Sequence, residues 1–309
     1  MAELPNISLR QLEAVREVGK SGTMVKAAQV LCVTPAALTS RVKLLEEDLG
    51  CQVFERANGR LRLTEAGKEV VAAAARISNV ISDLVDSVQG TNGILGGRIR
   101  IGVVSTAKYY APRLIAAFIK QHPKVDLRLS IRNRRDIISM LCDYETDISL
   151  MGRPPEDFAV KSEPIGPNPH VIIASPEHPL AGKDRISKKE LMKQEFIVRE
   201  EGSGTRNLFD YFFRGMALPS PKIRIEIGSN ETIKQAVMAG LGISLISAHT
   251  IEAEIASGRL VILKMEGLPI VRQWFAIQRA DRMLSAPGQA MWMFMVKRGR
   301  YFLPQVNLD

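Results

Sequence analysis

Two segments with the hydrophobic spacing of α-helices lie almost end to end near the start of the chain, over residues 23–31 and 34–49. In the second segment, leucine and valine recur at steps of four, three and four residues, which places them on one stripe of a helix. Thr34 followed by Pro35 is a typical helix start. Two helices joined by so short a turn are typical of a helix-turn-helix. We predict that the buried stripe consists of Leu38, Val42, Leu45 and Leu49.

The face of this helix opposite the apolar stripe carries small and polar side chains. A surface without bulky groups can approach the base edges in the major groove of DNA. A helical hairpin that binds nothing would show the same spacing, so the motif by itself leaves both interpretations open. The face comprises Ala36, Thr39, Ser40 and Lys43.

A short basic hairpin is predicted directly after the second helix. Two strand-like pieces flank Asn58-Gly59, a dipeptide that favours a tight hairpin turn. We expect Arg56, Arg60 and Arg62 to cluster in this hairpin. A basic hairpin beside a helix-turn-helix is typical of a wing that contacts phosphates or a minor groove. The alternative is a solvated rim of arginines without a ligand.

Residues 64–90 are predicted to form one long helix, capped by Thr64 and tolerant of Gly67 near its start. Its apolar residues recur at alternating steps of four and three, which is the seam of a coiled coil. The helix lies between a small domain and the glycine-rich segment 90–97, which we interpret as a hinge. Such a helix has little of its own chain to contact, so a dimer is favoured over packing on its own domain. The predicted seam is Val70, Ala74, Ile77, Ile81, Leu84 and Val88.

Beyond the glycine-rich segment, strand-like and helix-like segments alternate, which indicates an α/β domain with parallel strands and crossover helices. Four of its strand-to-helix turns are rich in hydroxyl, amide and arginine side chains. Each turn alone is better explained by helix capping, but four together favour a cleft that binds an anion. The predicted effector-binding residues are Ser105, Thr106, Asn133, Arg134, Gly202, Ser203, Gly204, Thr205, Arg206, Asn230 and Thr232.

Composition and charge change this interpretation only slightly. Residues 1–90 carry as many acidic as basic side chains, so the whole net charge of +9 lies in the remaining chain. Bulk charge therefore does not support DNA binding by the N-terminal part. In the second part, the surplus agrees weakly with an anionic ligand.

Several classes of protein are excluded or disfavoured. No apolar run is long enough for a membrane span and no signal peptide is visible, so we expect a cytoplasmic protein without membrane contact. The scattered cysteines and histidines predict neither a metal site nor a bound cofactor. An enzyme is disfavoured because no catalytic motif is present. A solute-binding receptor would explain two lobes but not residues 1–90.

The stretch from Leu9 to Arg56, with "LRLTEAG" at 61–67, resembles the N-terminal signature of LysR-type transcriptional regulators. The resemblance implies an all-α winged helix-turn-helix with a linker helix, followed by an α/β, two-lobed effector domain similar to periplasmic binding proteins. It implies five segments: the winged helix-turn-helix at 1–63, the linker and dimerisation helix at 64–90, the first lobe at 91–162 and 267–309, and the second lobe at 163–266.

The resemblance also implies where DNA is contacted, at the start of the second helix. Three positions depart from the commonest family pattern: Pro35 replaces a frequent Gln, Ala36 a usual Pro, and Ser40 a common Arg. Fewer long donors then reach the bases, so readout of DNA shape gains importance. The implied contacts are Thr34, Pro35, Ala36, Thr39 and Ser40.

Within the family, the segments "VSTAKYYAPRLIAAF", "RNRRDI" and "MGRPP" resemble regulators of the Calvin-cycle CO2-fixation operons. This implies an effector such as ribulose 1,5-bisphosphate, phosphoenolpyruvate or NADPH, a double-stranded operator or promoter as partner, and a homodimer that pairs into a homotetramer. Effector binding would alter the bend of the DNA. Regulators of sulfur assimilation share the "SGTR" turn at 203–206, so they remain the alternative.

Overall fold

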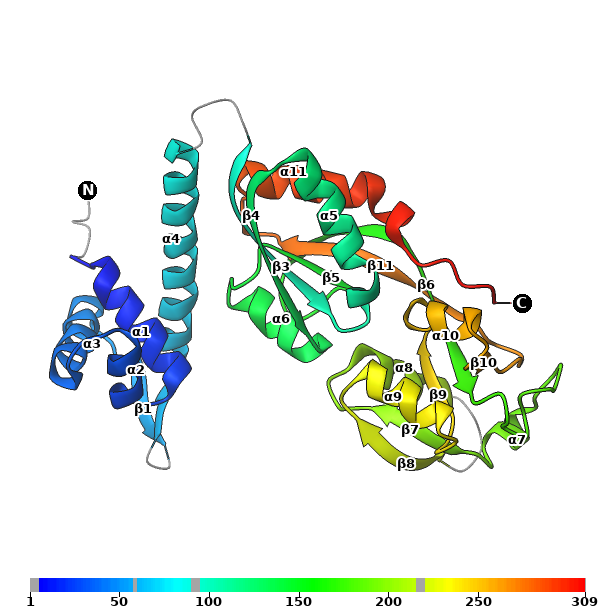
Figure 1. Cartoon of the computed structure of the whole chain (residues 1–309). Helices are drawn as coiled ribbons and strands as arrows, with labels where there is room; N and C mark the ends of the chain where they lie inside the picture. The colour runs from blue at the N-terminus through cyan, green and yellow to red at the C-terminus, as the bar shows by residue number, and fades with distance from the viewer. Residues whose placement is uncertain (1–5, 58–59, 90–94, 215–219, 309) are drawn as a thin grey trace. The chain divides into compact units, whose positions relative to one another are not determined.

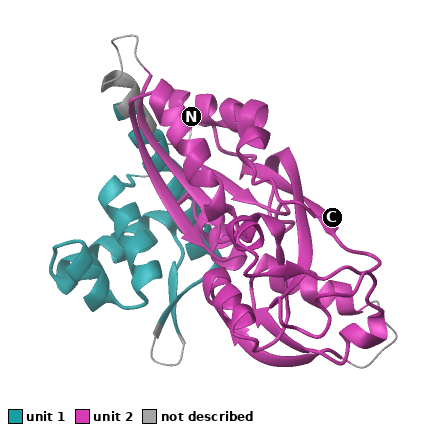
Figure 2. Ribbon diagram, turned by 45° about the vertical axis from the view of Figure 1, so that its right-hand side comes forward, with its two compact units in different colours: residues 1–89 teal, residues 90–309 magenta. Residues whose placement is uncertain are grey.

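The computed structural model describes residues 6–57, 60–89, 95–214 and 220–308 (Figure 1). It divides into two compact units, residues 1–89 and 90–309 (Figure 2). Among the described residues, no helix is long and apolar enough to cross a membrane. Each unit has its own core, so each is described by itself.

The first unit is a small helical domain with a two-stranded hairpin. Its core lies between the first three helices, the start of the fourth and the hairpin. The buried Ala27 and Ala28 let the second helix pack closely against its neighbours. In chain order the elements are α1 (Leu9–Ser21), α2 (Met24–Val30), α3 (Pro35–Leu49), β1 (Phe54–Ala57), β2 (Arg60–Leu63) and α4 (Glu65–Gln89).

The start of α4 is fixed by two contacts with the segment before β1. The Thr64 hydroxyl accepts a hydrogen bond from the Gly67 amide at 3.0 Å and donates one to the Gln52 carbonyl at 2.8 Å, which confirms the predicted cap. A Cβ atom at Gly67 would lie 2.1 Å from the Val53 carbonyl oxygen. The helix continues through Gly67 as predicted, and glycine is also required at this position, because only glycine permits this close approach.

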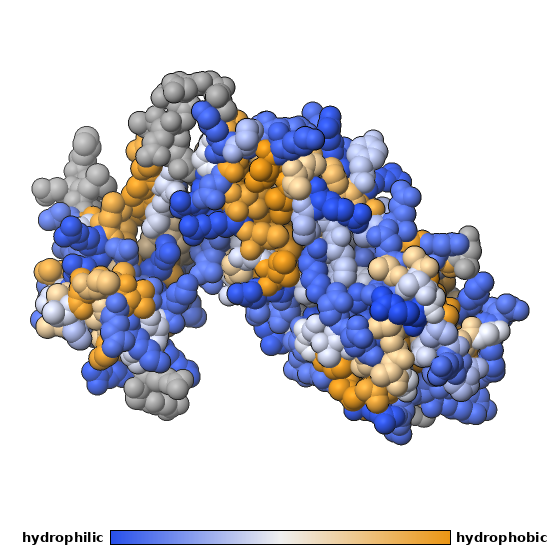
Figure 3. All heavy atoms as spheres, in the orientation of Figure 1, coloured by the Kyte–Doolittle hydropathy of each residue, from blue (hydrophilic) through white to orange (hydrophobic). Residues whose placement is uncertain are grey.

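The predicted seam of α4 divides into two parts. Val70 and Ala74 pack into the core of their own unit, which the sequence interpretation did not expect. Further along, Ile77 and Leu84 are exposed, and Val80 between them is 67% exposed. Hydrophobic surface is visible along this helix in Figure 3. The side chain of Val88 lies outside the described residues.

The second unit is an α/β structure in which strands and helices alternate, as predicted. Gly96 and Gly97, which the sequence interpretation placed in a hinge, begin the first strand, and residues 90–94 lie outside the described range. In chain order the elements are β3 (Gly96–Val104), η1 (Ala107–Tyr109), α5 (Ala111–Gln121), β4 (Lys124–Arg132), α6 (Arg134–Cys142), β5 (Ile148–Met151), β6 (Val160–Ala174), α7 (Lys188–Leu191), β7 (Glu195–Arg199), α8 (Gly204–Arg214), β8 (Lys222–Ile227), α9 (Asn230–Met238), β9 (Ser244–Ser247), η2 (Ala248–Thr250), α10 (Glu252–Ala256), β10 (Val261–Ile262), β11 (Ile270–Arg279), α11 (Ala286–Arg298) and η3 (Gly299–Phe302).

The main sheet has the strand order β10-β6-β11-β5-β3-β4, with β9 also paired to β6. The strands β3, β4 and β5 are parallel, whereas β11 is antiparallel to β5 and β6. The two long strands β6 and β11 run from the first lobe into the second (Figure 1). Pro164, Pro167 and Pro169 lie within β6, so this crossing is a continuous strand rather than a proline-terminated loop.

Each lobe of the second unit has a hydrophobic core. The first is built around β3, β5 and β11 with α5, α6 and α11, and includes the fully buried Trp274 and Tyr110. The second lies around β7, β9 and the second half of β6. Val306 and Leu308 pack against the second core, although the sequence interpretation assigned all of 267–309 to the first lobe.

Candidate nucleic-acid interface and ligand cleft

The helix α3 presents its predicted polar face to solvent. Leu38, Val42 and Leu45 are buried, and the Thr34 hydroxyl accepts a hydrogen bond from the Ala37 amide at 3.2 Å. The predicted apolar stripe and helix cap are thus confirmed, with Leu49 only partly buried. Every predicted contact position on this element is exposed: Thr34, Pro35, Ala36, Thr39, Ser40 and Lys43.

Two side chains of this face already make contacts within the helix. The Thr39 hydroxyl donates to the Pro35 carbonyl at 2.8 Å, so its oxygen and methyl group are what it offers to a ligand. The Lys43 ammonium lies 3.6 Å from the Glu47 carboxylate in an exposed pair. Exposed pairs of this kind contribute little, so Lys43 can exchange Glu47 for a phosphate.

The hairpin β1–β2 forms as predicted, but its register does not gather the arginines on one face. Arg62 pairs with Glu55, whereas Arg56 pairs with Leu61. Because successive side chains of a strand point to opposite faces, Arg56 and Arg62 lie on different sides of the ribbon. Both arginines lie in the hairpin as predicted and are exposed, one on each side of it. The Asn58-Gly59 turn and the Arg60 side chain lie outside the described residues.

A cavity of about 930 Å³ lies between the two lobes of the second unit. It is lined by the end of β3, the loop after β5, the middle of β6 and β11, and the start of α8. The carboxyl ends of parallel strands and a helix start meet here, which is where α/β proteins bind ligands. Six of the predicted effector-binding residues line it: Ser105, Thr106, Arg134, Ser203, Gly204 and Thr205.

The other five predicted residues do not line the cavity, because most serve the local structure. Asn133 caps α6 by accepting from the Asp136 amide at 2.9 Å. Arg206 is held by Asp210 and Glu226, at 3.2 and 2.6 Å. The remaining three are Gly202, which lies against the Arg135 side chain, Thr232, which is exposed, and Asn230, which contacts a cavity residue described next.

The sequence interpretation missed Arg199, the last residue of β7. Its side chain is 1% exposed, yet it lines the cavity. Its guanidinium donates to the Ser105 hydroxyl of the opposite lobe at 3.1 Å, to both carboxylate oxygens of Glu200 and to the Asn230 amide oxygen. The Asn230 amide nitrogen is buried without a hydrogen-bond partner among the described residues. Arg199 and Asn230 thus place buried hydrogen-bond donors beside the cavity.

Positive charge predominates around this cavity. Arg134 is tied to the loop after β5, since it donates to the carbonyls of Arg153 and Pro154. Burial, and then the neighbouring Arg153, lower the pKa of Arg134 from its ordinary value. The charged residues lining the cavity are Arg134, Arg153, Arg199, Arg214, Arg272, Glu156 and Asp157.

Two buried histidines lie at the crossing strands. Burial lowers the pKa of His170 and of His249 to about 4. The Trp274 ring N–H donates to His249 Nδ1 at 3.0 Å, which requires that nitrogen to be unprotonated. Both imidazoles are therefore neutral at pH 7.

We expect acid to destabilise the second unit through these histidines. Unfolded histidine binds a proton near pH 6.5, whereas His249 in the folded unit does so only near pH 4. The unfolded chain holds more protons in between, so the free energy of unfolding falls as the pH drops from 6.5 towards 4. Urea unfolding monitored by fluorescence measures this, because both tryptophans, Trp274 and Trp292, lie in this unit. His249→Asn, which keeps an acceptor for Trp274, should flatten the slope.

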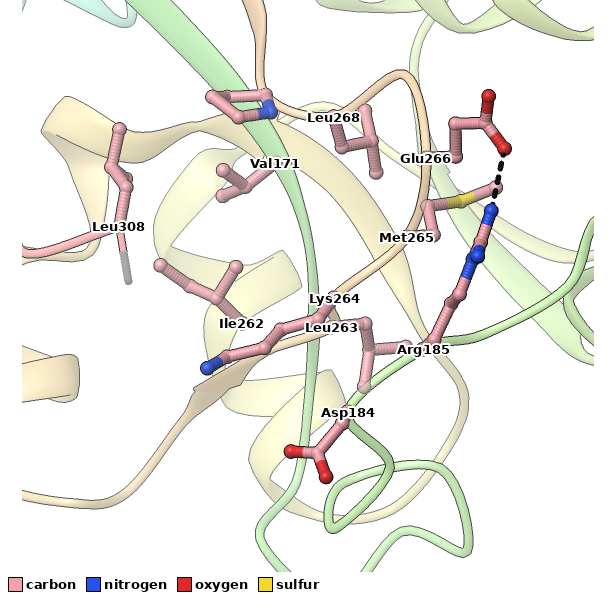
Figure 4. Close-up of a pocket in the computed structure, with 11 residues that line it drawn as sticks. Val171, Asp184, Arg185, Ile262, Leu263, Lys264, Met265, Glu266, Leu268 and Leu308 are labelled. Atoms are coloured by element: carbon pink, nitrogen blue, oxygen red, sulfur yellow. Dashed lines mark hydrogen bonds and ion pairs between the residues drawn. The ribbon is translucent and has the colours of Figure 1, made fainter.

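A second pocket, of about 330 Å³, lies in the second lobe beside β10 (Figure 4). Its walls are mainly aliphatic, including Val171, Ile262 and Leu308. Its charged side chains are exposed, and two of them, Arg185 and Glu266, pair with each other at 3.1 Å. The cavity between the lobes, with its buried guanidinium, is therefore the better candidate for binding an anion.

Comparison with known proteins identifies both units. Residues 9–68 match the family described as bacterial regulatory helix-turn-helix protein, lysR family, and residues 92–300 match the LysR substrate binding domain. The chain is 46% identical over 303 residues to the HTH-type transcriptional regulator CbbR of Xanthobacter flavus, covering 98% of this chain and 91% of the relative. It is 39% identical over 293 residues to the RuBisCO operon transcriptional regulator of Allochromatium vinosum, covering 94% and 96%.

A solved structure resembles the second unit. It is the Synechocystis PCC6803 CcmR regulatory domain in complex with 2-PG. The two proteins are 38% identical, the TM-score is 0.62, and the match covers 65% of this chain and 96% of that one. The second unit is therefore similar to a regulatory domain that was solved with 2-PG bound.

Proposed function

The chain belongs to the LysR family of bacterial helix-turn-helix transcriptional regulators, and from this premise we propose that it controls CO2-fixation genes in response to an anionic metabolite. Members of this family are regulators of transcription, not enzymes. Two relatives along nearly the whole chain are named as CbbR and as a RuBisCO operon regulator, which supports this gene set. The protein works in the cytoplasm, where both its DNA and its metabolite are found.

The DNA-binding half of the proposal rests on one observation, the exposed polar face of α3. Thr39 and Ser40 are exposed on the side of the helix opposite the buried Leu38 and Val42, so nothing in their own unit covers them. A helix with this face fits the major groove of a double-stranded operator or promoter. The hairpin arginines Arg56, Arg60 and Arg62 add contacts to phosphates or to the minor groove. Thr34, Pro35, Ala36 and Lys43 complete the proposed DNA surface.

The effector half of the proposal rests on the buried Arg199. A buried guanidinium forms strong hydrogen bonds with phosphate or carboxylate oxygens. Four hydroxyl side chains line the same cavity and can donate further hydrogen bonds to the oxygens of the anion: Ser105, Thr106, Ser203 and Thr205. The ligand 2-PG of the CcmR regulatory domain supports this class of metabolite. Ribulose 1,5-bisphosphate, phosphoenolpyruvate and NADPH are the other candidates.

The exposed apolar residues of α4 support a homodimer through this helix. Ile77, Val80 and Leu84 lie at the helical spacing of one stripe and are exposed in a single chain. Two such helices side by side would cover them and place two α3 helices on one operator. Two dimers then pair into a homotetramer. An effector that binds one arrangement of the lobes better than the other shifts the protein towards that arrangement. This shift changes how the dimers are positioned in the tetramer, and with it the bend of the DNA.

Substitutions on α3 and on the hairpin are expected to weaken DNA binding in different ways. Thr39→Ala should weaken binding to the operator about tenfold and leave binding to random sequence unchanged, because base contacts carry specificity. Arg62→Ala should weaken both about equally and reduce the dependence on salt, because phosphate contacts release counterions. Fluorescence anisotropy with operator and scrambled duplexes at several salt concentrations measures both effects.

The two variants serve as controls for each other. If Thr39→Ala and Arg62→Ala changed the two affinities and the salt dependence alike, the division between base readout and phosphate contact would be wrong. If neither variant altered operator binding, the proposed DNA surface would be wrong altogether.

A further inference from the structure

A cluster of charged and aromatic side chains joins the two lobes beside the ligand cavity. Tyr109 belongs to η1, which follows the cavity residues Ser105 and Thr106 in the first lobe. Its hydroxyl donates to the Glu231 carboxylate of α9, in the second lobe, at 2.5 Å. The Lys108 ammonium lies 3.6 Å from the same carboxylate oxygen. One carboxylate of the second lobe thus holds two adjacent residues of the first.

The carboxylate of Glu231 also forms an ion pair with a buried lysine, Lys234. Lys234 is 3% exposed, and its ammonium lies 3.0 Å from Glu231, 3.0 Å from Glu254 and 3.0 Å from the Thr250 carbonyl. The ring centroid of Tyr109 lies 4.9 Å from the same ammonium, within the range of a cation–π contact. Tyr109 therefore docks by its ring on Lys234 and by its hydroxyl on Glu231.

The protonation states at neutral pH suit this contact. Burial raises the pKa of Tyr109, and the hydrogen bond to Glu231 raises it further, so the phenol remains a donor. Burial by itself would raise the pKa of Glu231, but the hydrogen bond from Tyr109 and the pairing with Lys234 and Lys108 outweigh it and lower that pKa. The contact is a hydrogen bond from a neutral donor to an ionised acceptor, the stronger kind.

The same end of α9 also holds the buried arginine of the ligand cavity. Asn230, the residue before Glu231, accepts a hydrogen bond from Arg199, and Arg199 reaches across to Ser105. Two neighbouring residues of α9 are thus linked to two points of the first lobe that are four residues apart. A change in the relative position of the lobes must disturb both links together.

We propose that Tyr109 and Glu231 form a latch between the lobes, which stabilises the arrangement in which Arg199 meets Ser105. They act as positioning residues for the effector response and do not touch the effector themselves. This inference rests on the proposed function for its link to a metabolite, whereas the latch itself is a property of the chain without ligand. Loss of the latch lowers the population of this lobe arrangement, and the apparent affinity falls by the same factor.

Distances between the lobes test the latch directly in the full-length protein. Spin labels on Cys142 and on an introduced Lys189→Cys, with Cys32 and Cys51 replaced by serine, place one label on each lobe. All three cysteines and Lys189 are exposed in the structure. Dilution with unlabelled chains removes distances between subunits. Tyr109→Phe, which keeps the ring over Lys234, and Glu231→Gln should each broaden the distance distribution relative to the parent protein.

Ligand titration gives the second measurement. With phosphoenolpyruvate and 2-PG as probes, each variant should bind about tenfold more weakly, as expected for loss of one hydrogen bond to a charged group. The double variant should lose no more than Glu231→Gln alone, because that variant has already lost the ionised acceptor of the Tyr109 hydroxyl. Tyr301→Phe removes a hydroxyl from a side chain that is 83% exposed, and should leave distances and affinity unchanged.

The outcomes separate the latch from the proposed function. Unchanged distance distributions in both Tyr109→Phe and Glu231→Gln would overturn the latch, whatever the ligand affinities. If the parent protein bound none of the anions, the proposed effector class would fail. The distances in the variants without ligand would still decide whether the latch exists.

Discussion

Replacing Arg199 by glutamine is expected to lower the affinity for phosphoenolpyruvate or 2-PG about a hundredfold. The substitution removes the buried guanidinium that donates to Ser105 and Asn230 and could donate to an anionic effector. Loss of a charge-assisted hydrogen-bonded pair at a buried guanidinium is worth about 2–3 kcal/mol, which corresponds to this factor. Arg199→Lys keeps the charge but not the planar guanidinium, so the affinity of this variant should lie between those of the parent and of Arg199→Gln. Isothermal titration calorimetry measures the ligand affinity of the parent protein and of both variants.

A matched control is available in the next helix. Arg206 was predicted as an effector ligand, but Asp210 and Glu226 hold it and it does not line the cavity. Arg206→Gln should therefore leave effector affinity within about twofold of the parent, since the Arg206 guanidinium contacts Asp210, Glu226 and the Arg199 carbonyl and does not reach the cavity. Thermal unfolding would show that both variants are folded. If Arg206→Gln lost binding while Arg199→Gln kept it, the effector would not bind through Arg199 in this cavity.

Local patterns predicted the helices and strands well, because their signals are contained in a few neighbouring residues. The helix at 111–121 and the stripe of α3 follow from spacing and from proline at the helix start. The family resemblance predicted that the chain crosses between the lobes near residues 162 and 267, but not that each crossing is one continuous strand. Pairing with β11 keeps the three prolines of β6 within one extended strand.

The ligand cleft was harder to predict, because the same side chains serve capping and binding. Asn133 and Ser105 both follow strands, yet Asn133 caps a helix and Ser105 faces the other lobe. Only the tertiary arrangement separates these roles. Arg199 was hidden in a strand pattern, "FIVRE", and its burial depends on contacts with residues about 30 and 94 positions away. A basic residue at the carboxyl end of an apolar strand was the one signal that could have found it.

The close packing of Gly67 also could not be predicted from its neighbours in the sequence. Replacing Gly67 by alanine is expected to abolish specific DNA binding. The new Cβ atom would lie 2.1 Å from the Val53 carbonyl oxygen, a backbone atom that cannot rotate away. Either α4 or the segment before β1 must shift, which should cost the first unit about 3 kcal/mol of its free energy of unfolding. A unit of this size has only a few kcal/mol in reserve. Urea unfolding by circular dichroism and anisotropy with operator DNA measure the two effects.

Two comparisons make this prediction specific to the contact between Gly67 and Val53. Gly19→Ala, in the helix α1 of the same unit, places its Cβ atom 3.2 Å from the flexible Leu63 side chain, which can move. It should be neutral or slightly stabilising, because alanine favours a helix over glycine. In Gly67→Ala, the tryptophan fluorescence transition and effector affinity of the second unit should remain those of the parent. A Gly67→Ala protein with parental stability and operator binding would mean that α4 can move away from Val53 without consequence for the wing and α3.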